Sequence, residues 1–412
     1  MWVVFMCLVA LIAVWVSHWV YIWQNPKCNW KLPPGSMGFP LIGETLEYFT
    51  PHSLYDIPPF IKKRITRYGS LFRTNLVGQN IVVSTDPEFN YHIFKNEGKS
   101  FLFWYPESFT EIFGGQDILT YHGVVHKYLK NLVLHLVGPE NLKAKLLSEM
   151  EEMTRKHLTS WARCGTTVDI KQVSSEMVFN YFAYKLIGYD GLEGTRKLRE
   201  NFSAIINGII SFPLSIPGTA YHACLQGRKN ALKMIKEKFD ERKASNKKYG
   251  DYLDHLLEEV KKEDTILTEE IAVNLVFGLL FATYETTSTA LTLAVKFISD
   301  HPRVQAELAI EHMQIIKNRQ RKDSQITWQE YRSMTFTHMG NELHLGSKTF
   351  MGFGGGVRLC VGADFAKVQL AIFIHQLVLN LRWTVVKGGD IIRKPTLTFP
   401  NGLHLQILEK HL

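Results

Sequence analysis

The chain has 412 residues, 46% of them hydrophobic, so it is long enough to bury a large core as one big domain or two. Its formal charge of +8 is modest, and its basic residues interleave with acidic or apolar ones, which argues against a nucleic-acid-binding surface and favours a solvated or membrane-facing one. The five cysteines are scattered and include no C-x-x-C pair, which argues against a disulfide framework and fits a reducing compartment.

The first segment, residues 2–23, is an apolar run broken only by Ser17 and His18. As a helix it is long enough to span a hydrocarbon layer about 30 Å thick. A cleaved signal peptide is the alternative, but no charged side chain precedes the run and no A-x-A site follows it. Lysines follow the run and none precedes it, so we expect residues 1–26 to be a retained transmembrane anchor, with the rest of the chain in the cytosol.

Prolines and glycines recur in residues 27–45, and this composition predicts a stiff elbow between the anchor and the domain that follows. Farther along, β-rich runs at residues 68–76 and 79–84 flank Gly78, which predicts a hairpin. The tripeptide Asp-Pro-Glu at residues 86–88 then predicts the start of a helix.

Helical patterns cover residues 142–161 and 173–187, and an apolar stretch at 212–219, broken by two prolines, interrupts the helices that follow. Residues 268–300 predict one long helix, because Thr268 can cap it and two glutamates occupy its first turn. Such a helix would be about 50 Å long, enough to cross a whole domain.

The middle of this long helix reads ATYETT at residues 282–287. An acid next to hydroxyls inside an otherwise apolar helix is costly unless it serves a purpose, so Glu285 and Thr286 are candidate functional residues. The alternative is that these hydroxyls only bond back to carbonyls of their own helix.

Residues 350–363 read FMGFGGGVRLCVGA, a tight glycine loop that presents one thiol and turns directly into a helix. The glycines permit positive φ and let the backbone approach a flat ligand closely. Arg358 and the positive N-terminus of the following helix are expected to lower the pKa of Cys360, which would make it a ready metal ligand. The alternative is a glycine turn with a buried structural cysteine. The full F-x-x-G-x-R-x-C-x-G spacing favours the ligand.

Beyond the thiol, residues 363–381 are apolar nearly all round, which predicts a fully buried helix. Residues 396–405 alternate around an Asn-Gly pair at 401–402, which predicts a terminal hairpin.

With this cysteine loop, the chain resembles the cytochrome P450 family of haem-thiolate monooxygenases, in which a thiolate on the iron favours O–O cleavage. The resemblance covers residues 32–412 and implies a mainly α fold with small β-sheets (α+β), with residues 46–412 as the haem domain. Residues 213–229 look most like the plant clan that oxidises triterpenoids and steroids. The aromatic-rich residues 101–113 would form the first wall of the substrate pocket, with ordinary core as an equally good interpretation.

The resemblance implies an enzyme that inserts one oxygen atom of O₂ into an apolar isoprenoid. Its cofactor would be haem b, and its electrons would come from an NADPH-dependent flavoprotein reductase. Membrane lipid would surround its anchor, which implies a single-pass protein of the endoplasmic reticulum membrane with a cytosolic catalytic domain.

The resemblance also assigns the ligand loop. Cys360 would be the axial thiolate ligand of the haem iron, because it stands at the cysteine of the family motif. The other motif positions, which would hold the cofactor, are Phe353, Gly356, Arg358 and Gly362.

Further positions match the family less closely. Glu285 and Thr286 would manage protons on the oxygen side, although this chain has Thr283 where the family has glycine. His126 and Lys130 occupy the place of the W-x-x-x-R motif, whose side chains bind a haem propionate. Both are hydrogen-bond donors, so the role is chemically feasible without the arginine fork.

The resemblance has one gap, near residues 339–341, where elements of the family are missing from this sequence. At this point the family has a helix carrying E-x-x-R, two strands and a meander carrying P-x-R, which together form a buried Glu–Arg–Arg network behind the cysteine loop. The sequence lacks this block, so we expect the chain to be impaired as an oxygenase. Two functions stay open: a monooxygenase, or a non-catalytic membrane-anchored remnant or splice form that binds haem poorly.

Overall fold

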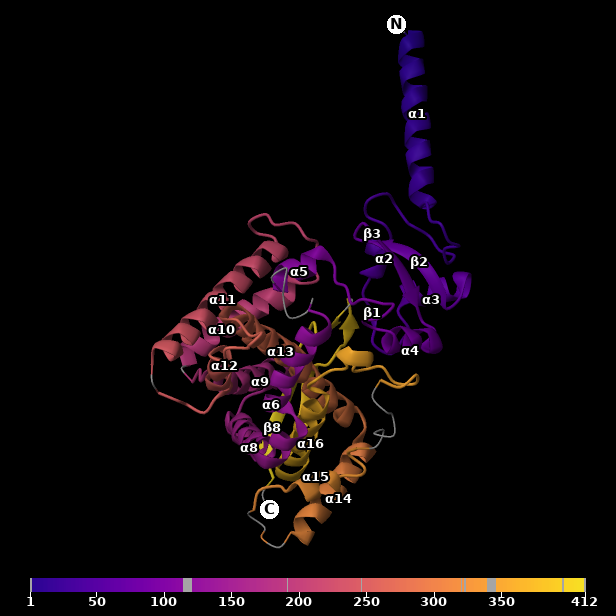
Figure 1. Cartoon of the computed structure of the whole chain (residues 1–412). Helices are drawn as coiled ribbons and strands as arrows, with labels where there is room; N and C mark the ends of the chain where they lie inside the picture. Colours follow the sequence, from indigo (N-terminus) through magenta and orange to yellow (C-terminus); the bar gives the residue numbers. More distant parts are fainter. Residues whose placement is uncertain are drawn as a thin grey trace. The chain divides into compact units, whose positions relative to one another are not determined.

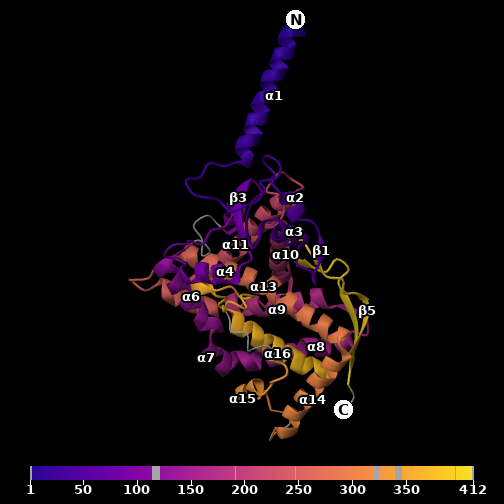
Figure 2. The ribbon, with the colours of Figure 1, turned by 90° about the vertical axis from the view of Figure 1, so that its right-hand side faces the viewer.

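The structure is a computed structural model that describes residues 2–410 except 114–120, 191, 246, 320, 322–323, 339–345 and 395. The described chain is mainly helical with three small sheets, as the predicted α+β class requires (Figures 1 and 2). It divides into two compact units. The first comprises Met1–Lys95, Ser347–Phe350 and Asp390–Pro400, and the second comprises the remaining residues.

The first unit begins with α1 (Trp2–Gln24) (Figure 1). Most of the apolar side chains of this helix are exposed. The apolar helix predicted for residues 2–23 is therefore present, and its length and hydropathy suit a membrane span. Its end is tied to the elbow, because Trp23 Nε1 donates to the Met37 carbonyl at 3.2 Å and Gln24 Nε2 to the Gly38 carbonyl at 2.8 Å.

Next in the first unit come α2 (Thr45–Tyr48), α3 (Pro59–Tyr68) and α4 (Pro87–Lys95). A buried ion network joins the first two of these helices. Arg64 Nη2 lies 2.6 Å from a Glu44 carboxylate oxygen and 2.8 Å from one of Glu47, and Thr74 donates to Glu44 at 2.6 Å. Because each buried charge has a partner, this polar cluster can lie in the interior of the unit.

The predicted hairpin is present as β2 (Leu71–Leu76) and β3 (Gln79–Ser84), paired antiparallel from Leu71↔Ser84 to Leu76↔Gln79. Val77 and Gly78, the two turn residues, both have positive φ. Among the described residues, no strand pairs with the outer edge of β3. A two-stranded sheet is marginally stable by itself, and an open edge invites pairing with other chains.

The second unit contains most of the helices. They are α5 (Glu107–Phe113), α6 (Gly123–Val137), α7 (Pro139–Asn141), α8 (Leu147–Arg163), α9 (Ile170–Ile187), α10 (Leu192–Gly208), α11 (Ala220–Ala244), α12 (Tyr252–Val260), α13 (Glu269–Asp300), α14 (Pro302–Asn318), α15 (Trp328–Arg332) and α16 (Ala363–Asn380). Its sheet has the strand order β4 (Val168–Asp169), β8 (Leu403–Glu409), β5 (Leu381–Gly388).

Helix α13 runs through the core of this unit and packs against α9 and α16 (Figure 2). Thr268 caps it as predicted, since its hydroxyl accepts from the Ile271 amide at 3.2 Å. Helix α16 is buried on nearly all sides, which confirms the helix predicted after the thiol. Helix α13 is long and apolar enough to span a membrane, but half of its apolar stretch is buried inside this unit. It is therefore a core helix.

The prediction of a hairpin around residues 401–402 is wrong, because the strands on the two sides of this turn do not pair with each other. Its two flanks join different sheets: β7 (Leu397–Thr398) pairs with β6 (Ile392–Arg393), and β8 pairs with β5 and β4. The remaining sheet strand, β1 (His52–Ser53), also pairs with β6. Pairing with the long strand β5 and burial of its alternate leucines in the core stabilise β8 more than a two-residue strand can.

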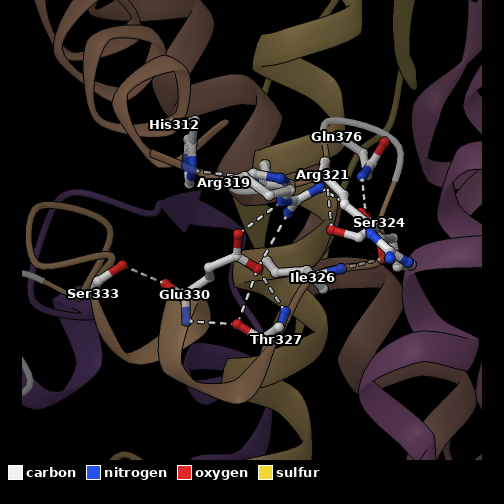
Figure 3. A network of polar contacts seen from close by, with 11 residues as sticks. His312, Arg319, Arg321, Ser324, Ile326, Thr327, Glu330, Ser333 and Gln376 are labelled. Carbon is white, nitrogen blue, oxygen red and sulfur yellow. Dashed lines mark hydrogen bonds and ion pairs between the residues drawn. The ribbon is translucent and has the colours of Figure 1, made fainter. Parts of the chain in front are cut away.

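The segment after α14 is held to the core by a polar network (Figure 3). Arg319 Nε lies 2.7 Å from a Glu330 carboxylate oxygen, with side chains only 7% and 17% exposed. The Ile326 amide donates to Glu151 of α8 at 2.8 Å, and Gln376 of α16 donates to the same carboxylate at 3.0 Å. The chain is therefore firmly docked as it approaches residue 339, and the predicted join at 339–341 itself lies outside the described residues.

Two buried histidines face each other between α14 and α16. His312 Nδ1 and His375 Nδ1 are 3.0 Å apart, and neither residue is solvent-exposed. Burial lowers the pKa of His312 to about 4 and that of His375 to about 3. Both imidazoles are therefore neutral in the folded protein at neutral pH, and one donates its hydrogen to the other.

We expect this pair to make the fold acid-sensitive. The unfolded chain binds a proton on each histidine near pH 6.5, whereas the folded chain does so only near pH 4 and below. Stability is thus lost as pH falls below 6.5, by on the order of 2 kcal/mol per histidine at pH 4.5. Between pH 7 and pH 4.5, the midpoint of urea unfolding should fall less in His375→Gln than in the unmodified chain. An equal fall of the midpoint in both proteins would contradict this assignment.

Candidate functional site

The cysteine loop has the predicted form. Cys360 is exposed, its amide donates to the Phe353 carbonyl at 3.0 Å, and α16 begins only three residues later, at Ala363. Gly354 and Gly356 have φ of +77° and +62°, a region in which a side chain would be strained. The loop thus presents an accessible sulfur just before a helix, which is the geometry that thiolate ligation needs.

Residues of the segment that precedes α6 surround the Arg358 guanidinium. Its Nε donates to a Glu97 carboxylate oxygen at 2.8 Å, and its Nη2 donates to the Tyr121 carbonyl at 2.5 Å. The Phe103 ring lies 4.3 Å from the guanidinium carbon, within cation–π range. Glu97 was not among the residues that the sequence singled out, because it is far from Arg358 along the chain and has no motif of its own.

Two residues of α6 lie beside the same loop. Lys130 Nζ donates to the Val357 carbonyl at 3.0 Å, so it contacts the ligand loop directly. The pKa of His126 is lowered, first by burial and then by the positive charges of Arg358 and Lys130. The structure therefore brings His126, Lys130 and Arg358 together around the loop. The Arg358 charge is already paired with Glu97, so Lys130 is the cation of this group that can balance an anionic ligand.

Glu285 and Thr286 lie in the middle of α13, which is unbroken from Glu269 to Asp300. The Thr286 hydroxyl donates to the Ala282 carbonyl at 2.5 Å, and Thr283 donates likewise to the Leu279 carbonyl at 2.8 Å. Back-bonding, the alternative reading of these hydroxyls, is thus what the structure contains. Helix α13 continues without interruption past Thr283, the position at which the family has glycine.

One stripe of α13 stays open, although most of the helix is buried. Ala282 and Thr286 are exposed, and a Cβ added at Gly278 would meet no neighbour within 4 Å. These three positions are four residues apart, so they lie above one another on one face. Because small side chains leave room above the backbone, a flat or bulky ligand can lie along this stripe.

The Glu285 carboxylate is held by Lys171 at the start of α9. Lys171 Nζ lies 2.9 Å from Glu285 Oε1 and donates to Ser288 Oγ at 2.9 Å, while Thr289 donates to the same carboxylate oxygen at 3.1 Å. Burial lowers the pKa of Lys171, and the Glu285 charge opposes that shift. Lys171 is a site residue that the sequence did not indicate, because only packing of α9 on α13 brings it there.

Aromatic side chains of residues 101–113 pack onto α13 beside the open stripe. The Phe109 and Phe113 rings are 4.9 Å apart, and Phe113 contacts Phe281 at 4.8 Å and Phe277 at 6.0 Å. Phe281 directly precedes Ala282 of the stripe. Phe113 is buried in the core and Phe109 packs against it, so this part of the segment is core, and its role as a wall of the substrate pocket stays a prediction.

These residues fit a haem. An exposed thiol on a glycine loop can bind iron as a thiolate, Lys130 beside the loop can contact a propionate, and small residues leave one stripe of α13 uncovered.

Comparison with known families decides the identity. The cytochrome P450 family model matches residues 33–340 and 340–408, which together cover most of the chain. This chain belongs to the cytochrome P450 family. Members are monooxygenases that hold haem iron through a cysteine thiolate, use O₂ and a redox-partner reductase, and act on apolar substrates. The expected family and fold are thereby confirmed.

Plant relatives narrow the branch of the P450 family. "Cytochrome P450 87A3" of Oryza sativa subsp. japonica is 44% identical, covering 96% of this chain and 89% of that protein. "Beta-amyrin 16-alpha-hydroxylase CYP87D16" of Maesa lanceolata is 36% identical and "Cucurbitadienol 11-hydroxylase" of Siraitia grosvenorii is 35% identical, each covering 100% of both chains. The solved structure of retinoic acid-bound cyanobacterial CYP120A1 aligns with a TM-score of 0.75 over 92% of this chain and 99% of that one, at 19% identity, and so supports the P450 fold alone.

The P450 match comes in two pieces that meet at residue 340. The alignment with the Maesa lanceolata hydroxylase runs over 476 positions, whereas this chain has 412 residues, so at least 64 positions have no residue of this chain opposite them. The Siraitia grosvenorii alignment, over 474 positions, leaves at least 62. This chain is therefore shorter than these relatives internally, while it covers them from end to end.

Proposed function

We propose that this P450 carries the site of a monooxygenase that inserts one oxygen atom of O₂ into an apolar isoprenoid of triterpenoid or steroid type, and that the internal shortening impairs it. The similarity to relatives named as β-amyrin and cucurbitadienol hydroxylases supports this substrate class. The aromatic rings beside the open stripe of α13 support an apolar, polycyclic substrate, because they offer a wide hydrophobic surface.

Cys360 would hold the iron of haem b, within the loop formed by Phe353, Gly356, Arg358 and Gly362. When bound, haem supplies the iron at which O₂ is activated. His126 and Lys130 would face the propionate side, since Lys130 already contacts the loop. Two lone donors give a weaker anion site than an arginine fork does.

The proton-handling residues would be Glu285 and Thr286. The Thr286 hydroxyl lies on the open stripe, where it can turn from the Ala282 carbonyl toward a ligand at the cost of one hydrogen bond. Lys171 and Thr289 fix the Glu285 carboxylate one residue away, which keeps an acid–base group beside the stripe. In this arrangement the Thr286 hydroxyl and the Glu285 carboxylate would hold protons next to each other on the helix.

Impairment rests on the internal shortening at residue 340. The two-piece family match and the unmatched positions of the relatives support a missing block that would carry E-x-x-R and P-x-R. In the part of the chain that the structure describes, β3 has no strand at its outer edge, which supports it as well, because a two-stranded sheet is only marginally stable. The E-x-x-R matches at Glu152 and Glu193 do not replace the block, since both glutamates are exposed on helix surfaces.

The second candidate function is a non-catalytic, membrane-anchored remnant that binds haem poorly. The observation that favours it is the same shortening, since a fold stable by only about 5–15 kcal/mol can hardly lose several core elements. Both candidates share the anchor, with residues 27–45 as the elbow and residues 46–412 as the domain.

We expect residues 1–26 to anchor the chain in the endoplasmic reticulum membrane, with the domain in the cytosol, because α1 is apolar except at Ser17, His18 and Gln24 and lysines follow its C-terminal end. Deleting residues 1–31 should move most of the protein into the soluble fraction. The exposed Phe212, Leu214 and Ile216 can retain a smaller part on lipid. Complete release of the intact chain by carbonate washing would refute the anchor.

Labelled oxygen tests the proposed chemistry directly. Microsomes that contain this chain and a flavoprotein reductase should convert a triterpenoid or sterol panel, with NADPH and ¹⁸O₂, into products that carry one labelled oxygen atom. We expect a low yield, and we expect a version with the block restored to raise it. The absence of labelled product from both versions, across the panel, would contradict an isoprenoid oxygenase and favour the remnant.

A further inference from the structure

We infer that Glu97 is a positioning residue that holds the cysteine loop in place through Arg358. This inference deepens the proposed haem site, on which its functional meaning rests. Arg358 ends the short helical turn Gly356–Arg358 and stands two residues before Cys360. Any restraint on the Arg358 side chain is thus passed to the backbone that carries the thiol.

We call the Glu97–Arg358 ion pair, together with the contacts of Arg358 with Phe103 and Tyr121, the strap. Arg358 Nε donates to Glu97 at 2.8 Å, and the two side chains are only 14% and 10% exposed. The Phe103 ring lies against the guanidinium, and the Tyr121 carbonyl accepts from Nη2. Contacts on three sides leave the guanidinium one position, so the loop end is fixed to the chain before α6.

Glu97 itself is held by a local turn. The Gly98 amide donates to the Phe101 carbonyl at 2.7 Å, and Gly98 has φ of +78°, which favours glycine. This turn places the Glu97 carboxylate and the Phe103 ring on the same guanidinium. Because the ion pair is largely removed from water, removing one partner leaves a buried charge uncompensated, which is strongly unfavourable.

The strap has a second attachment in the same loop. Lys130 of α6 donates to the carbonyl of Val357, the neighbour of Arg358. The loop is therefore held from the α6 side by Lys130 and from the preceding segment by Glu97. If the Glu–Arg–Arg network is missing, this strap is the restraint on the thiol loop that the described residues still provide.

Hydrogen exchange on the full-length chain in detergent or nanodiscs tests the strap without any haem. The isosteric, uncharged Glu97→Gln should raise amide exchange in peptides covering residues 353–362 by roughly tenfold, since a buried charge-assisted bond is lost. Glu97→Asp keeps the charge on a shorter side chain and should raise exchange by a smaller factor. It also serves as the second variant if Glu97→Gln folds poorly.

Glu330→Gln is the matched control, because it breaks the equally buried Arg319–Glu330 pair away from the loop. It should loosen its own segment and leave exchange in residues 353–362 unchanged. Unchanged loop exchange in Glu97→Gln, or an equal rise in Glu330→Gln, would overturn the strap.

A haemin titration measures how the same variants bind the cofactor. With the loop loosened, Glu97→Gln should bind haemin more weakly and with a smaller thiolate fraction than Glu330→Gln does. If Glu97 instead competes with a propionate for Arg358, Glu97→Gln would bind haemin more tightly, and that result would also overturn the strap. Failure of every variant to bind haemin would count against the proposed function and leave the exchange result standing.

Discussion

Replacing Cys360 with serine should abolish thiolate-type haem ligation in this chain, with loss of the spectral signature of the reduced carbon monoxide complex. A neutral hydroxyl cannot replace a thiolate as iron ligand. Cys360 is also the exposed thiol of the one loop that matches the family motif. The measurement is the difference spectrum of Cys360→Ser beside the unmodified chain, with haem content determined separately.

The other cysteines supply the controls for this prediction. Cys28 and Cys164 are exposed like Cys360 but lie outside the ligand loop, and Cys224 is buried in α11. Serine at any of these positions should leave thiolate ligation unchanged. A Cys360→Ser protein that kept both its haem and an unchanged spectrum would remove Cys360 as the ligand.

Restoring the missing block at residue 340 should raise haem retention and turnover by roughly 10- to 100-fold, the range that partners of a metal ligand commonly control. The gain is expected because the block would supply the network behind the cysteine loop and further strands beside β3. His126 and Lys130 lie on the α6 side of the loop and cannot take over that role. A restored chain that carries alanine at the glutamate of E-x-x-R should lose most of the gain, which makes it the matched control.

Much of the architecture could be predicted from local signals. Caps and periodicity gave α13 and α16 nearly to the residue, because long apolar helices carry their own start and stop signals. The glycine loop gave Cys360 an exposed position before a helix. The terminal hairpin could not be predicted, because β8 pairs with β5 and β4, and local alternation does not reveal which strand a leucine face will join.

Sequence motifs indicated candidate site residues, but they did not indicate the distant residues that contact them in the fold. Glu97 and Lys171 each hold a predicted residue, Arg358 and Glu285 respectively, through ion pairs between segments far apart in the chain. Neither has a distinctive neighbour in sequence, so only the fold identifies them. The gap expected near residues 339–341 was inferred from the lack of a motif, and this part of the chain lies outside the described residues.

The reduced carbon monoxide difference spectrum, recorded per mole of protein on microsomes with this chain and with the block-restored chain, shows whether Cys360 holds haem without the family's Glu–Arg–Arg network. We expect a clear thiolate-type Soret band for the restored chain and a weak or absent one for this chain, at equal protein levels. Equal bands and equal turnover from both chains would contradict it, because they would mean that the ligand loop holds its haem without the missing network.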